Sequence, residues 1–434
     1  MTLREKITTH SAVVGVVGIG YVGLPLAVEK AKVGYRVIGY DRNAIRVAQI
    51  NQGSNYIRDV ADDDLTRVVA NEKLTATTDF STLDFCDVII ICVPTPLTVN
   101  KDPDISYIRS VGNEITRRLR PGQLICLEST TYPGTTEEVL LPQFATTGLV
   151  VGKDYFLAYS PERVDPGNKR YTTKNTNKVV GGVTATCLSV AATFYQQTIV
   201  DVLSLTSPRV AEMTKVFENT FRAVNIALVN EMALLCDRMG INIWEVIDAA
   251  STKPFGMMRF DPGPGVGGHC IPLDPFYLNW KARQYDFHTR FIELAGEINN
   301  QMPYFVREKV SRALNERGRP LKGSRVLMLG ISYKKDIPDW RESPAVKIMT
   351  LLTQADAIVD YHDPFVPSFQ DDQGSVRHSV PLTEKGLGEA DCVVITTDHS
   401  QTDWRLVVRN AKIVIDTRNA TKNVVDNRNN IILL

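Results

Sequence analysis

Short runs of apolar residues alternate with helical patterns along the first half of the chain. Valine, isoleucine and leucine dominate AVVGVV after Ser11, and also YRVIGYD, DVIIICVP, QLICLEST and FLAYS. Runs of this length without polar alternation are typical of strands buried on both faces, and segments between them, such as LPLAVEKAK, have helical spacing. The pattern predicts a parallel sheet with helices on both faces.

The pattern changes after about Leu205. From Pro208 to Gly240 there is no internal proline or glycine, and apolar positions recur at helical spacing, which predicts one long helix. Further helices are predicted over 242–250 and 285–314.

From Gly323 the first pattern returns, with strands in SRVLMLGISY, AIVDYHDP, ADCVVITTDH and AKIVIDTRN and a helix from Pro344 to Leu352. The predicted fold class is α/β, with two Rossmann-like parallel-sheet domains joined by a helical central domain that contains the long helix. We place the domains at 1–205, 206–318 and 319–434.

Composition limits the classes of partner that this chain can be expected to bind. The chain has 434 residues with 49 basic and 49 acidic side chains, so no overall charge favours nucleic acid. Seven cysteines without a CxxC pair argue against a disulfide framework or a metal site and favour a reducing cytoplasm. The N-terminus lacks an apolar signal core, and the run Val13–Val17 is too short to cross a membrane. We therefore expect a cytoplasmic protein with neither a nucleic-acid nor a membrane partner.

A glycine-rich turn follows the first strand. Gly18, Gly20 and Gly23 form GxGxxG, with Ile19, Tyr21 and Val22 between them, and a helix begins there. These glycines allow a tight turn, close approach of a pyrophosphate and close helix–strand packing. The alternative is a tight strand–helix turn without a ligand.

Asp41 favours the nucleotide interpretation of that turn. It ends the next strand, where a carboxylate can accept a hydrogen bond from a ribose hydroxyl of the cofactor. Because a carboxylate there would repel a 2′-phosphate, NAD is favoured over NADP. The neighbouring Arg42 and Arg46 weaken that preference. Thr95 and Thr130 end later strands and are candidates to face cofactor or substrate, although threonine is common at strand ends.

One cysteine differs from the rest. Cys270 lies in GPGVGGHCIPLDP, whereas the other six occupy apolar contexts where a thiol behaves as a core residue: Cys86, Cys92, Cys126, Cys187, Cys236 and Cys392. A thiolate in a loop of accessible backbone N–H groups can attack a carbonyl carbon while those groups stabilise the oxyanion. The adjacent His269 is not expected to be the base, because neighbouring loop residues point apart.

Other polar residues could assist this thiol. Lys215 and Asn219 are four apart on the long helix and share a face, so they could hold an alkoxide, whereas a lone lysine there would be a solvated charge. Asp274 could orient water or the lysine. Glu162, in the loop YSPERVDPG, could be a general base on water or a structural carboxylate.

Motifs along nearly the whole chain resemble the nucleotide-sugar 6-dehydrogenase family, which includes UDP-glucose and UDP-N-acetylmannosamine dehydrogenases. They are GxGYVGLP, VPTP, ESTTYPGTT, YSPER, EMTKxxEN, GPGxGGHCIPxDPFY and GISYKKDxxDxRESPA, in this order. The chain is most similar to the bacterial enzymes that oxidise UDP-N-acetylglucosamine for surface polysaccharides such as lipopolysaccharide O-antigen.

The resemblance implies roles for individual residues. Cys270 would be the nucleophile, Lys215, Asn219 and Asp274 the groups that stabilise the oxyanion and orient water, Glu162 the base for thioester hydrolysis and Thr130 a water-positioning residue. NAD would contact Gly18, Ile19, Gly20, Tyr21, Val22, Gly23, Asp41, Arg46, Thr95, Thr130 and Arg341. The UDP-sugar would contact Glu162, Arg163, Val164, Lys215, Asn219, Arg259, Gly265, Gly267, Gly268 and Lys334.

The implied reaction is a four-electron oxidation of C6 of the sugar through a thiohemiacetal and a thioester. UDP-N-acetylglucosamine is favoured over UDP-N-acetylmannosamine and UDP-glucose on overall similarity alone. The last domain lacks GxGxxG, so it is expected to bind UDP rather than a second NAD. Lys334, with Arg325 or Arg341, would meet the phosphates there.

Two other functions and an oligomeric state complete the expectations. The competing functions are a two-electron hydroxy-acid or sugar-phosphate dehydrogenase and a non-catalytic nucleotide-sugar sensor. The long helix is apolar on several sides, at Val224, Ile226, Ala227, Leu228 and Val229, which favours a homodimer or a higher assembly. Arg259 could reach a substrate across such an interface.

Overall fold

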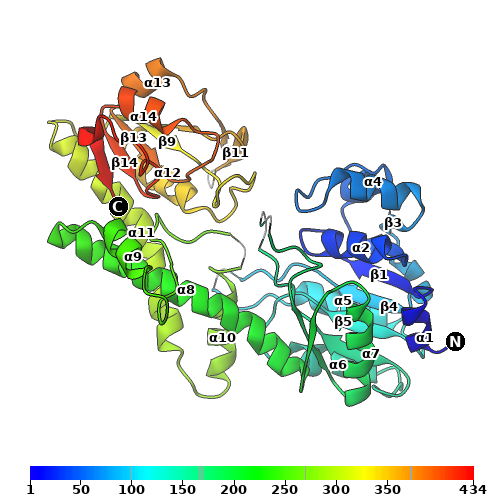
Figure 1. Ribbon diagram of the computed structural model, residues 1–434. Coiled ribbons are helices and arrows are strands. Elements are labelled where there is room, and N and C mark those ends of the chain that lie inside the picture. The colour runs from blue at the N-terminus through cyan, green and yellow to red at the C-terminus, as the bar shows by residue number, and fades with distance from the viewer. Residues whose placement is uncertain (99, 166–167, 169, 269, 372–373) are drawn as a thin grey trace. The chain divides into compact units, whose positions relative to one another are not determined.

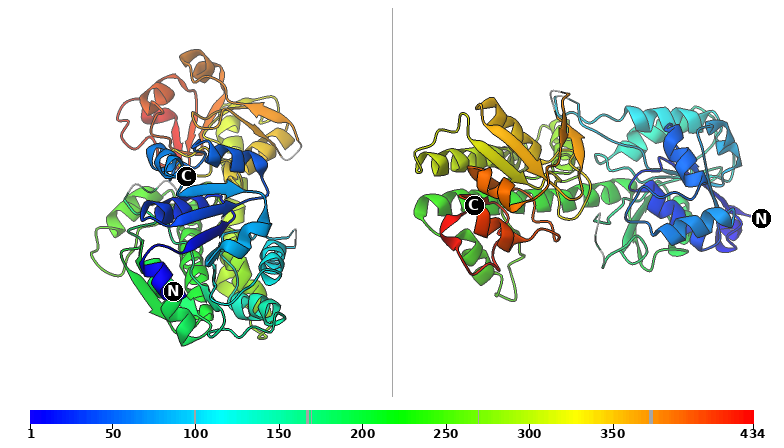
Figure 2. Two further views of the ribbon diagram at one scale, coloured as in Figure 1. Left: turned by 90° about the vertical axis from the view of Figure 1, so that its right-hand side faces the viewer. Right: turned by 90° about the horizontal axis from the view of Figure 1, so that it is seen from above.

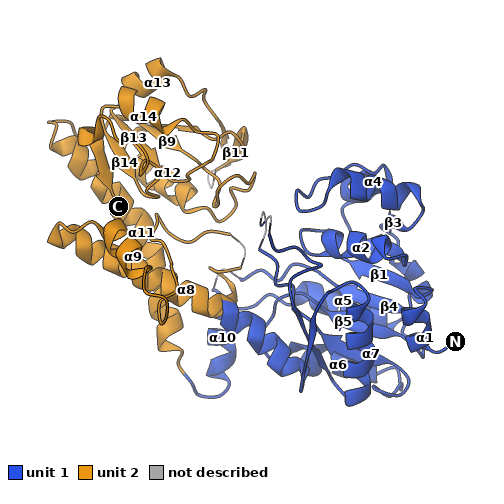
Figure 3. Ribbon diagram, in the orientation of Figure 1, with its two compact units in different colours: residues 1–218, 276–287 blue, residues 219–275, 288–434 orange. Residues whose placement is uncertain are grey.

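The structure is a computed structural model that describes residues 1–98, 100–165, 168, 170–268, 270–371 and 374–434. The chain forms two compact units, 1–218 with 276–287 and 219–275 with 288–434 (Figure 3). The helix α8, Pro208–Met239, belongs to both units because the division falls between Glu218 and Asn219. His269 lies outside the described residues.

The first unit is built on an eight-stranded sheet in the order β3-β2-β1-β4-β5-β6-β7-β8 (Figure 1). The strands are β1 Val13–Val17, β2 Arg36–Tyr40, β3 Leu74–Thr77, β4 Val88–Ile91, β5 Leu124–Leu127, β6 Phe156–Tyr159, β7 Lys178–Gly182 and β8 Val202–Leu205. All neighbours pair in parallel except β6 and β7, which are antiparallel. The strand order reverses between β1 and β4, and such a switch point is where open sheets bind nucleotides.

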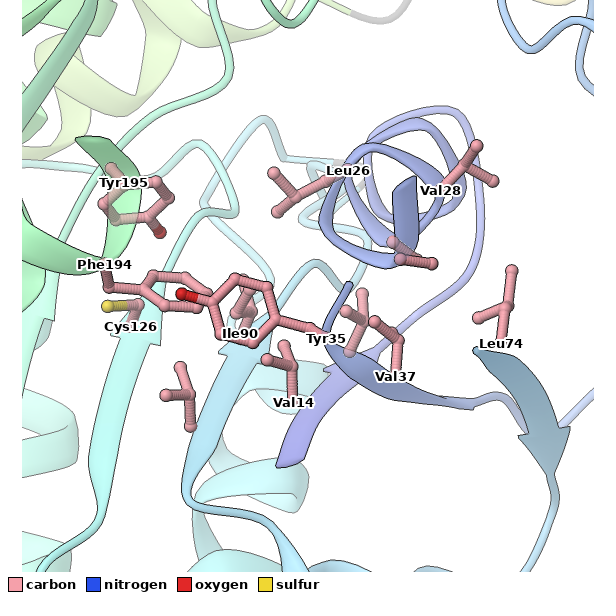
Figure 4. Close-up of a cluster of buried hydrophobic side chains, with 14 of the residues drawn as sticks. Val14, Leu26, Val28, Tyr35, Val37, Leu74, Ile90, Cys126, Phe194 and Tyr195 are labelled. Atoms are coloured by element: carbon pink, nitrogen blue, oxygen red, sulfur yellow. The ribbon is translucent and has the colours of Figure 1, made fainter. Parts of the chain in front are cut away.

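Helices cover this sheet. They are α1 Leu3–Thr8, α2 Gly23–Lys32, α3 Ala44–Asn51, α4 Asp62–Ala70, α5 Ser106–Thr116, α6 Leu141–Ala145 and α7 Ala185–Gln196, with short helical turns η1 Phe80–Phe85 and η2 Thr136–Leu140. Alternate strand residues enter two cores: Val14 and Ile90 pack with Leu26 of α2 and Phe194 of α7 (Figure 4), whereas Ile89 packs with the side of α5 and α6. Burial on both faces accounts for the unbroken apolar runs.

The second unit has a five-stranded sheet in the order β10-β9-β13-β14-β15, parallel throughout. Its strands are β9 Arg325–Leu329, β10 Ile358–His362, β13 Cys392–Ile395, β14 Val414–Asp416 and β15 Ile431–Leu433, and a separate antiparallel pair joins β11 Ser368–Gln370 to β12 Val376–His378. Its helices are α9 Ile243–Ala250, α11 Arg290–Asn315, α12 Pro344–Gln354, α13 Glu384–Glu389, α14 Trp404–Asn410 and the short turn η3 Arg428–Asn430. The predicted α/β fold class is confirmed.

The long helix is also confirmed: α8 is one helix of 32 residues, green in Figures 1 and 2. Two details differ from the expectation. The helix predicted from Tyr285 begins at Arg290, and α10, Asp274–Arg283, was not expected because its second residue is a proline. Proline is tolerated there because the first-turn N–H groups of a helix have no partner within the helix. Among the described residues, no helix combines the length and apolar character that a bilayer crossing needs.

Candidate active site

The glycine-rich turn after β1 has the geometry of a dinucleotide site. Gly18 has φ +90°, and a side chain there would overlap the backbone of Cys92. A side chain at Gly23 would overlap the carbonyl oxygen of Gly18, so this residue brings α2 against the turn. Above Gly20 there is open space within 4 Å, so the turn can accept a pyrophosphate facing the first N–H groups of α2.

Asp41 closes this turn on one side. Its carboxylate accepts hydrogen bonds from the N–H of Ile19 at 3.3 Å and of Asn43 at 2.9 Å. Arg46 lies 3.6 Å from the same carboxylate, and Tyr21 between the glycines is exposed. A carboxylate held at the edge of the turn suits the ribose hydroxyls of NAD, so the residues fit the expected cofactor.

The loops after β4 and β5 are joined by a threonine. The hydroxyl of Thr95 donates to the carbonyl oxygen of Thr130 at 2.7 Å, and Ser129 donates to the carbonyl oxygen of Val93 at 2.8 Å. Both threonines are half-buried. Thr95 therefore fixes the backbone of Thr130. From the sequence alone, both threonines could only be placed at strand ends.

Glu162 lies in a tight loop after β6. Its Oε1 accepts the N–H groups of Arg163 and Val164, each at 2.8 Å. Arg163 donates two hydrogen bonds to Glu218 of α8, at 2.9 and 2.6 Å, and a third to the carbonyl oxygen of Asn177 at 2.7 Å. Arg163 and Val164, which are expected from the sequence to contact the substrate, thus hold the Glu162 carboxylate in place through their backbone N–H groups.

Lys215 lies on α8 with only 6% of its surface exposed. Among the described residues, no carboxylate lies within ion-pair distance of its ammonium. An ammonium is rarely buried without a paired anion, so this lysine is suited to a bound anionic group rather than to a solvated surface.

One turn before Lys215, Glu212 was missed by sequence reasoning. It is fully buried and accepts the N–H groups of Gly134 and Thr136 and the hydroxyl of Thr136. Burial raises the pKa of Glu212 to about 7, against the opposing effect of these hydrogen bonds. The glutamate thus caps the helical turn η2 and attaches it to α8.

In the second unit, Cys270, Asp274 and Asn219 form one connected group. The Asp274 N–H donates to the carbonyl oxygen of Cys270 at 2.8 Å as α10 begins. The side-chain amide of Asn219 donates to the Asp274 carboxylate, and Arg222 donates to the amide oxygen of Asn219. Arg222 was not singled out from the sequence, although its spacing of three from Asn219 indicated it.

The cysteines differ as expected in exposure. Cys270 is exposed, whereas Cys86, Cys126, Cys187 and Cys392 are buried. Burial raises the pKa of Cys86 to about 11 and the pKa values of Cys126 and Cys392 to about 12, so these thiols stay protonated. Cys92 and Cys236 are half-buried rather than in the core, because each lies at the edge of a packed cluster.

The glycines before Cys270 pack against the last α/β region. Side chains at Gly267 and Gly268 would lie within 3 Å of Tyr333, and a side chain at Gly265 would lie 3.0 Å from Pro344. Gly265 and Gly268 also have positive φ, +133° and +88°. These glycines are therefore required by the fold of the second unit itself, whatever they allow a substrate.

Three cations named from the sequence also lie in this unit. Arg341 forms a two-pronged pair with Asp339, at 2.9 and 2.8 Å, and Arg259 pairs with Asp248 at 2.6 Å and Asp261 at 2.9 Å. Lys334 is half-buried in the loop after β9. The two arginines are held in place by carboxylates of their own unit.

A buried carboxylate occupies the ribose position of the second sheet. Asp363 follows β10 as Asp41 follows β2, and its Oδ2 accepts the N–H groups of Ile331 and Ser332, at 2.7 and 3.0 Å. The Nε2 of His399 lies 3.1 Å from the same oxygen. The hydrogen bonds and His399 hold the pKa of Asp363 well below its usual range, although burial opposes them.

Comparisons with known proteins agree with this geometry. Three family models match the chain: the NAD binding domain of the UDP-glucose/GDP-mannose dehydrogenase family over 12–199, its central domain over 209–301 and its UDP binding domain over 327–423. The Rossmann-like ends and the helical middle of the chain thus each match a part of one family.

Individual relatives cover nearly the whole chain. The UDP-N-acetyl-D-glucosamine 6-dehydrogenase of Pseudomonas aeruginosa is 37% identical over 89% of this chain and 90% of its own length. The UDP-N-acetyl-D-mannosamine dehydrogenase of Pyrococcus horikoshii is 36% identical over 94% and 96%. A solved structure of the UDP-D-ManNAc dehydrogenase from Pyrococcus horikoshii has a TM-score of 0.88, with 97% of this chain and 98% of that chain covered at 34% identity. The chain therefore belongs to the UDP-glucose/GDP-mannose dehydrogenase family and is an NAD-dependent UDP-sugar dehydrogenase.

Proposed function

We propose that this enzyme oxidises C6 of UDP-N-acetyl-D-glucosamine to the uronic acid, in four electrons, for polysaccharide synthesis. The observation that carries the four-electron reaction is the exposed Cys270, joined through its own carbonyl oxygen to Asp274 and through Asp274 to Asn219. A dehydrogenase that stops at an aldehyde needs no thiol, whereas oxidation to an acid gains from covalent capture.

In the proposed reaction, Cys270 forms both covalent intermediates. Bound NAD supplies the hydride acceptor in each of two oxidations. Between them the Cys270 thiolate forms a C–S bond to the C6 aldehyde carbon, giving a thiohemiacetal, and after the second it holds C6 as a thioester. Water then adds to that carbon, the C–S bond breaks and the thiolate is restored. Overall, one alcohol, two NAD and one water give one carboxylate, two NADH and three protons.

The proposal assigns supporting roles to several polar side chains. Lys215 and Asn219 stabilise the oxygen that becomes negative at C6, and Asp274 orients Asn219. Glu162 accepts the proton of the attacking water, and Thr130, fixed by Thr95, positions that water. Cofactor contacts are assigned to the glycine turn with Asp41 and Arg46, and to Thr95, Thr130 and Arg341.

Substrate contacts follow the same proposal. Arg163, Val164, Arg259, Lys334 and the glycines Gly265, Gly267 and Gly268 are assigned to the UDP-sugar. N-acetylglucosamine is preferred because the Pseudomonas aeruginosa relative that carries this name is 37% identical. UDP-N-acetylmannosamine is the second candidate, because a relative of that name is 36% identical over a larger share of the chain.

The test counts NADH formed per acid produced, with NAD and UDP-N-acetylglucosamine, UDP-N-acetylmannosamine or UDP-glucose as substrates. We expect two NADH per acid and the highest kcat/KM with UDP-N-acetylglucosamine. One NADH per product would indicate a two-electron dehydrogenase, and binding without turnover would indicate a sensor. A higher kcat/KM with UDP-N-acetylmannosamine would replace the sugar and leave the reaction unchanged.

We also propose that the enzyme assembles as a homodimer through α8. One face of this helix carries exposed apolar side chains at Val210, Met213, Phe217, Phe221, Leu228, Leu235 and Met239. Their spacing of three, four or seven residues places them along one stripe. A stripe of this kind on a protein in water is typical of a protein–protein interface, and a second copy of α8 offers a matching apolar surface.

A further inference from the structure

A row of charged side chains, formed by Glu128, Lys178 and Glu162, lies beside the loop after β6. Lys178, the first residue of β7, has its Nζ 3.0 Å from Oε2 of Glu128, 3.2 Å from the carbonyl oxygen of Pro161 and 3.7 Å from Oε2 of Glu162. The side chains of Lys178 and Glu128 are 4% and 0% exposed, and that of Glu162 is 16% exposed. Tyr195 of α7 donates to the other oxygen of Glu128 at 2.5 Å.

The sheet topology explains how a strand-initial lysine reaches this place. In a parallel sheet, the first residue of a strand lies at the edge opposite to the ligand-binding carboxyl ends. Because β7 runs antiparallel to β6, with Tyr159 opposite Gly181, Lys178 instead lies beside the loop that follows β6. Glu128 follows β5, which is parallel to β6, so it lies at the same edge.

The contacts of Glu162 leave one of its oxygens for chemistry. Oε1 accepts the N–H groups of Arg163 and Val164. Among the described residues, no donor lies within hydrogen-bond distance of Oε2, and at 3.7 Å the Lys178 ammonium attracts it electrostatically without occupying it. Oε2 can thus accept a proton from water while the nearby ammonium orients it.

Lys178 is itself charged in this setting. Burial lowers the pKa of Lys178, but Glu128 and Glu162 raise it by more, so the pKa lies above its ordinary value. Burial raises the pKa of Glu128, which Lys178 opposes. The other titratable groups around the row are Cys92, Cys126, Tyr195 and Lys30, together with Arg163, which pairs with Glu218.

We propose that Lys178 is a positioning residue for thioester hydrolysis. Its ammonium holds the loop of Glu162 through the carbonyl oxygen of Pro161 and orients Oε2 of Glu162, and Glu128 competes for the same ammonium. The inference rests on the proposed function, in which Glu162 is the base. In the step concerned, the water oxygen bonds to the thioester carbon, its proton passes to Oε2 of Glu162, and the C–S bond breaks to release the Cys270 thiolate.

The test follows hydrolysis separately from hydride transfer. In a single turnover, the two NADH report the oxidations, and acid quenching with mass spectrometry reports the sugar still bound to the enzyme as a thioester. Lys178→Met should slow hydrolysis about tenfold while both oxidations keep their rates, because the loop of Glu162 loses the charge-assisted hydrogen bond that positions it. The thioester should therefore accumulate after the second NADH has formed.

Glu128→Gln should hydrolyse the thioester at least as fast as the wild type, because the ammonium is then left to the loop of Glu162 alone. Lys178→Arg should restore most of the lost rate. If Lys178→Met does not fold, Glu128→Gln/Lys178→Met removes both buried charges together and should still slow hydrolysis. Lys32→Met is the control, since Lys32 lies in the same unit but pairs with Glu29 and Asp64 rather than with this cluster.

Two results distinguish the positioning role of Lys178 from the role of Glu162 as the base. If Glu162→Gln abolishes hydrolysis while Lys178→Met hydrolyses the thioester at the wild-type rate, the positioning role is wrong and the base assignment stands. If Glu162→Gln hydrolyses the thioester at the wild-type rate, the base assignment is wrong and the role of Lys178 falls with it. The two NADH per acid test the overall reaction independently of both.

Discussion

At the scale of the residue, exposure separates one thiol from six others. Cys86, Cys126 and Cys392 have their pKa values raised by burial, whereas Cys270 meets solvent where α10 begins. A thiolate is the nucleophilic form of cysteine, so a buried thiol with a raised pKa is inert at neutral pH. Accessibility thus selects the residue that the glycine-rich motif had already indicated.

Replacing this thiol should remove the second half of the reaction. Cys270→Ser should slow formation of the acid by orders of magnitude, because a hydroxyl stays protonated and attacks the aldehyde poorly. Affinity for the UDP-sugar, measured by calorimetry, should change little. Cys236→Ser, which alters a half-buried cysteine of the same unit, is the control. Turnover of Cys270→Ser at the wild-type rate would contradict the role of the nucleophile.

Sequence reasoning found residues whose role follows from local spacing. The glycine turn, Asp41, Cys270 and the pair Lys215 and Asn219 could all be read from short motifs. Lys178 could not, because its partner Glu128 is 50 residues away and meets it only through the reversed strand β7. Glu212 was missed for the same reason, since the N–H groups it caps lie 76 and 78 residues earlier.

At the scale of the element, α8 carries several functions on one helix. Glu212, Lys215, Asn219 and Arg222 follow at spacings of three, four and three, so they lie along one face. Glu212 holds η2, and Asn219 holds Asp274 at the start of α10. The helical pattern predicted this element well because proline and glycine are absent from its interior, whereas Pro275 concealed α10.

The cap on η2 should make stability depend on pH. The unfolded chain ionises Glu212 near 4.5, whereas the folded protein keeps it protonated to about pH 7. The contribution of Glu212 to stability is therefore fully present below pH 4.5 and is lost as the pH rises to 7. The free energy of unfolding of Glu212→Gln, relative to wild type, should rise by about 3 kcal/mol between pH 4 and pH 8, since each pKa unit is about 1.4 kcal/mol.

Urea unfolding at the two pH values measures this difference. Glu72→Gln, at an exposed turn residue, is the control and should change the free energy of unfolding by a similar small amount at both. A difference for Glu212→Gln that is the same at pH 4 and pH 8 would show that folding does not raise the pKa of this carboxyl.

At the scale of the whole molecule, the chain uses the same sheet design twice. In each sheet a glycine with φ near +90° follows the first strand along the chain, Gly18 after β1 and Gly330 after β9. In each, the aspartate just before a neighbouring strand accepts a hydrogen bond from the first N–H of this first strand, Asp87 from Val13 and Asp391 from Arg325. The alternation of strands and helices predicted most strands of both sheets. It did not predict β7 as a strand, because Lys178–Gly182 ends in two glycines, which are unfavourable inside a strand.

The proposed dimer gives the prediction at this scale. Phe217→Glu with Leu228→Glu places two charges on the exposed stripe of α8, where the side chains are 62% and 52% exposed. We expect the variant to sediment as a monomer at concentrations where the wild type is a dimer, because an unpaired charge is costly in an apolar interface. Val200→Glu, at a position that is 73% exposed and outside α8, should leave the association state unchanged. A wild type that sediments as a monomer would overturn the proposed dimer.

Asp363 has a consequence for how the repeated design could be altered. Its partners, the N–H groups of Ile331 and Ser332 and the ring of His399, already use the oxygen that an adenosine would need. Adding glycines to the loop after β9 would therefore not by itself create a second dinucleotide pocket. An engineer would first have to free the carboxylate, and the surrounding backbone would then lose the anchor that shapes the loop. The two sheets thus share an outline, whereas the hydrogen bonds around this aspartate distinguish the second sheet from the NAD-binding one.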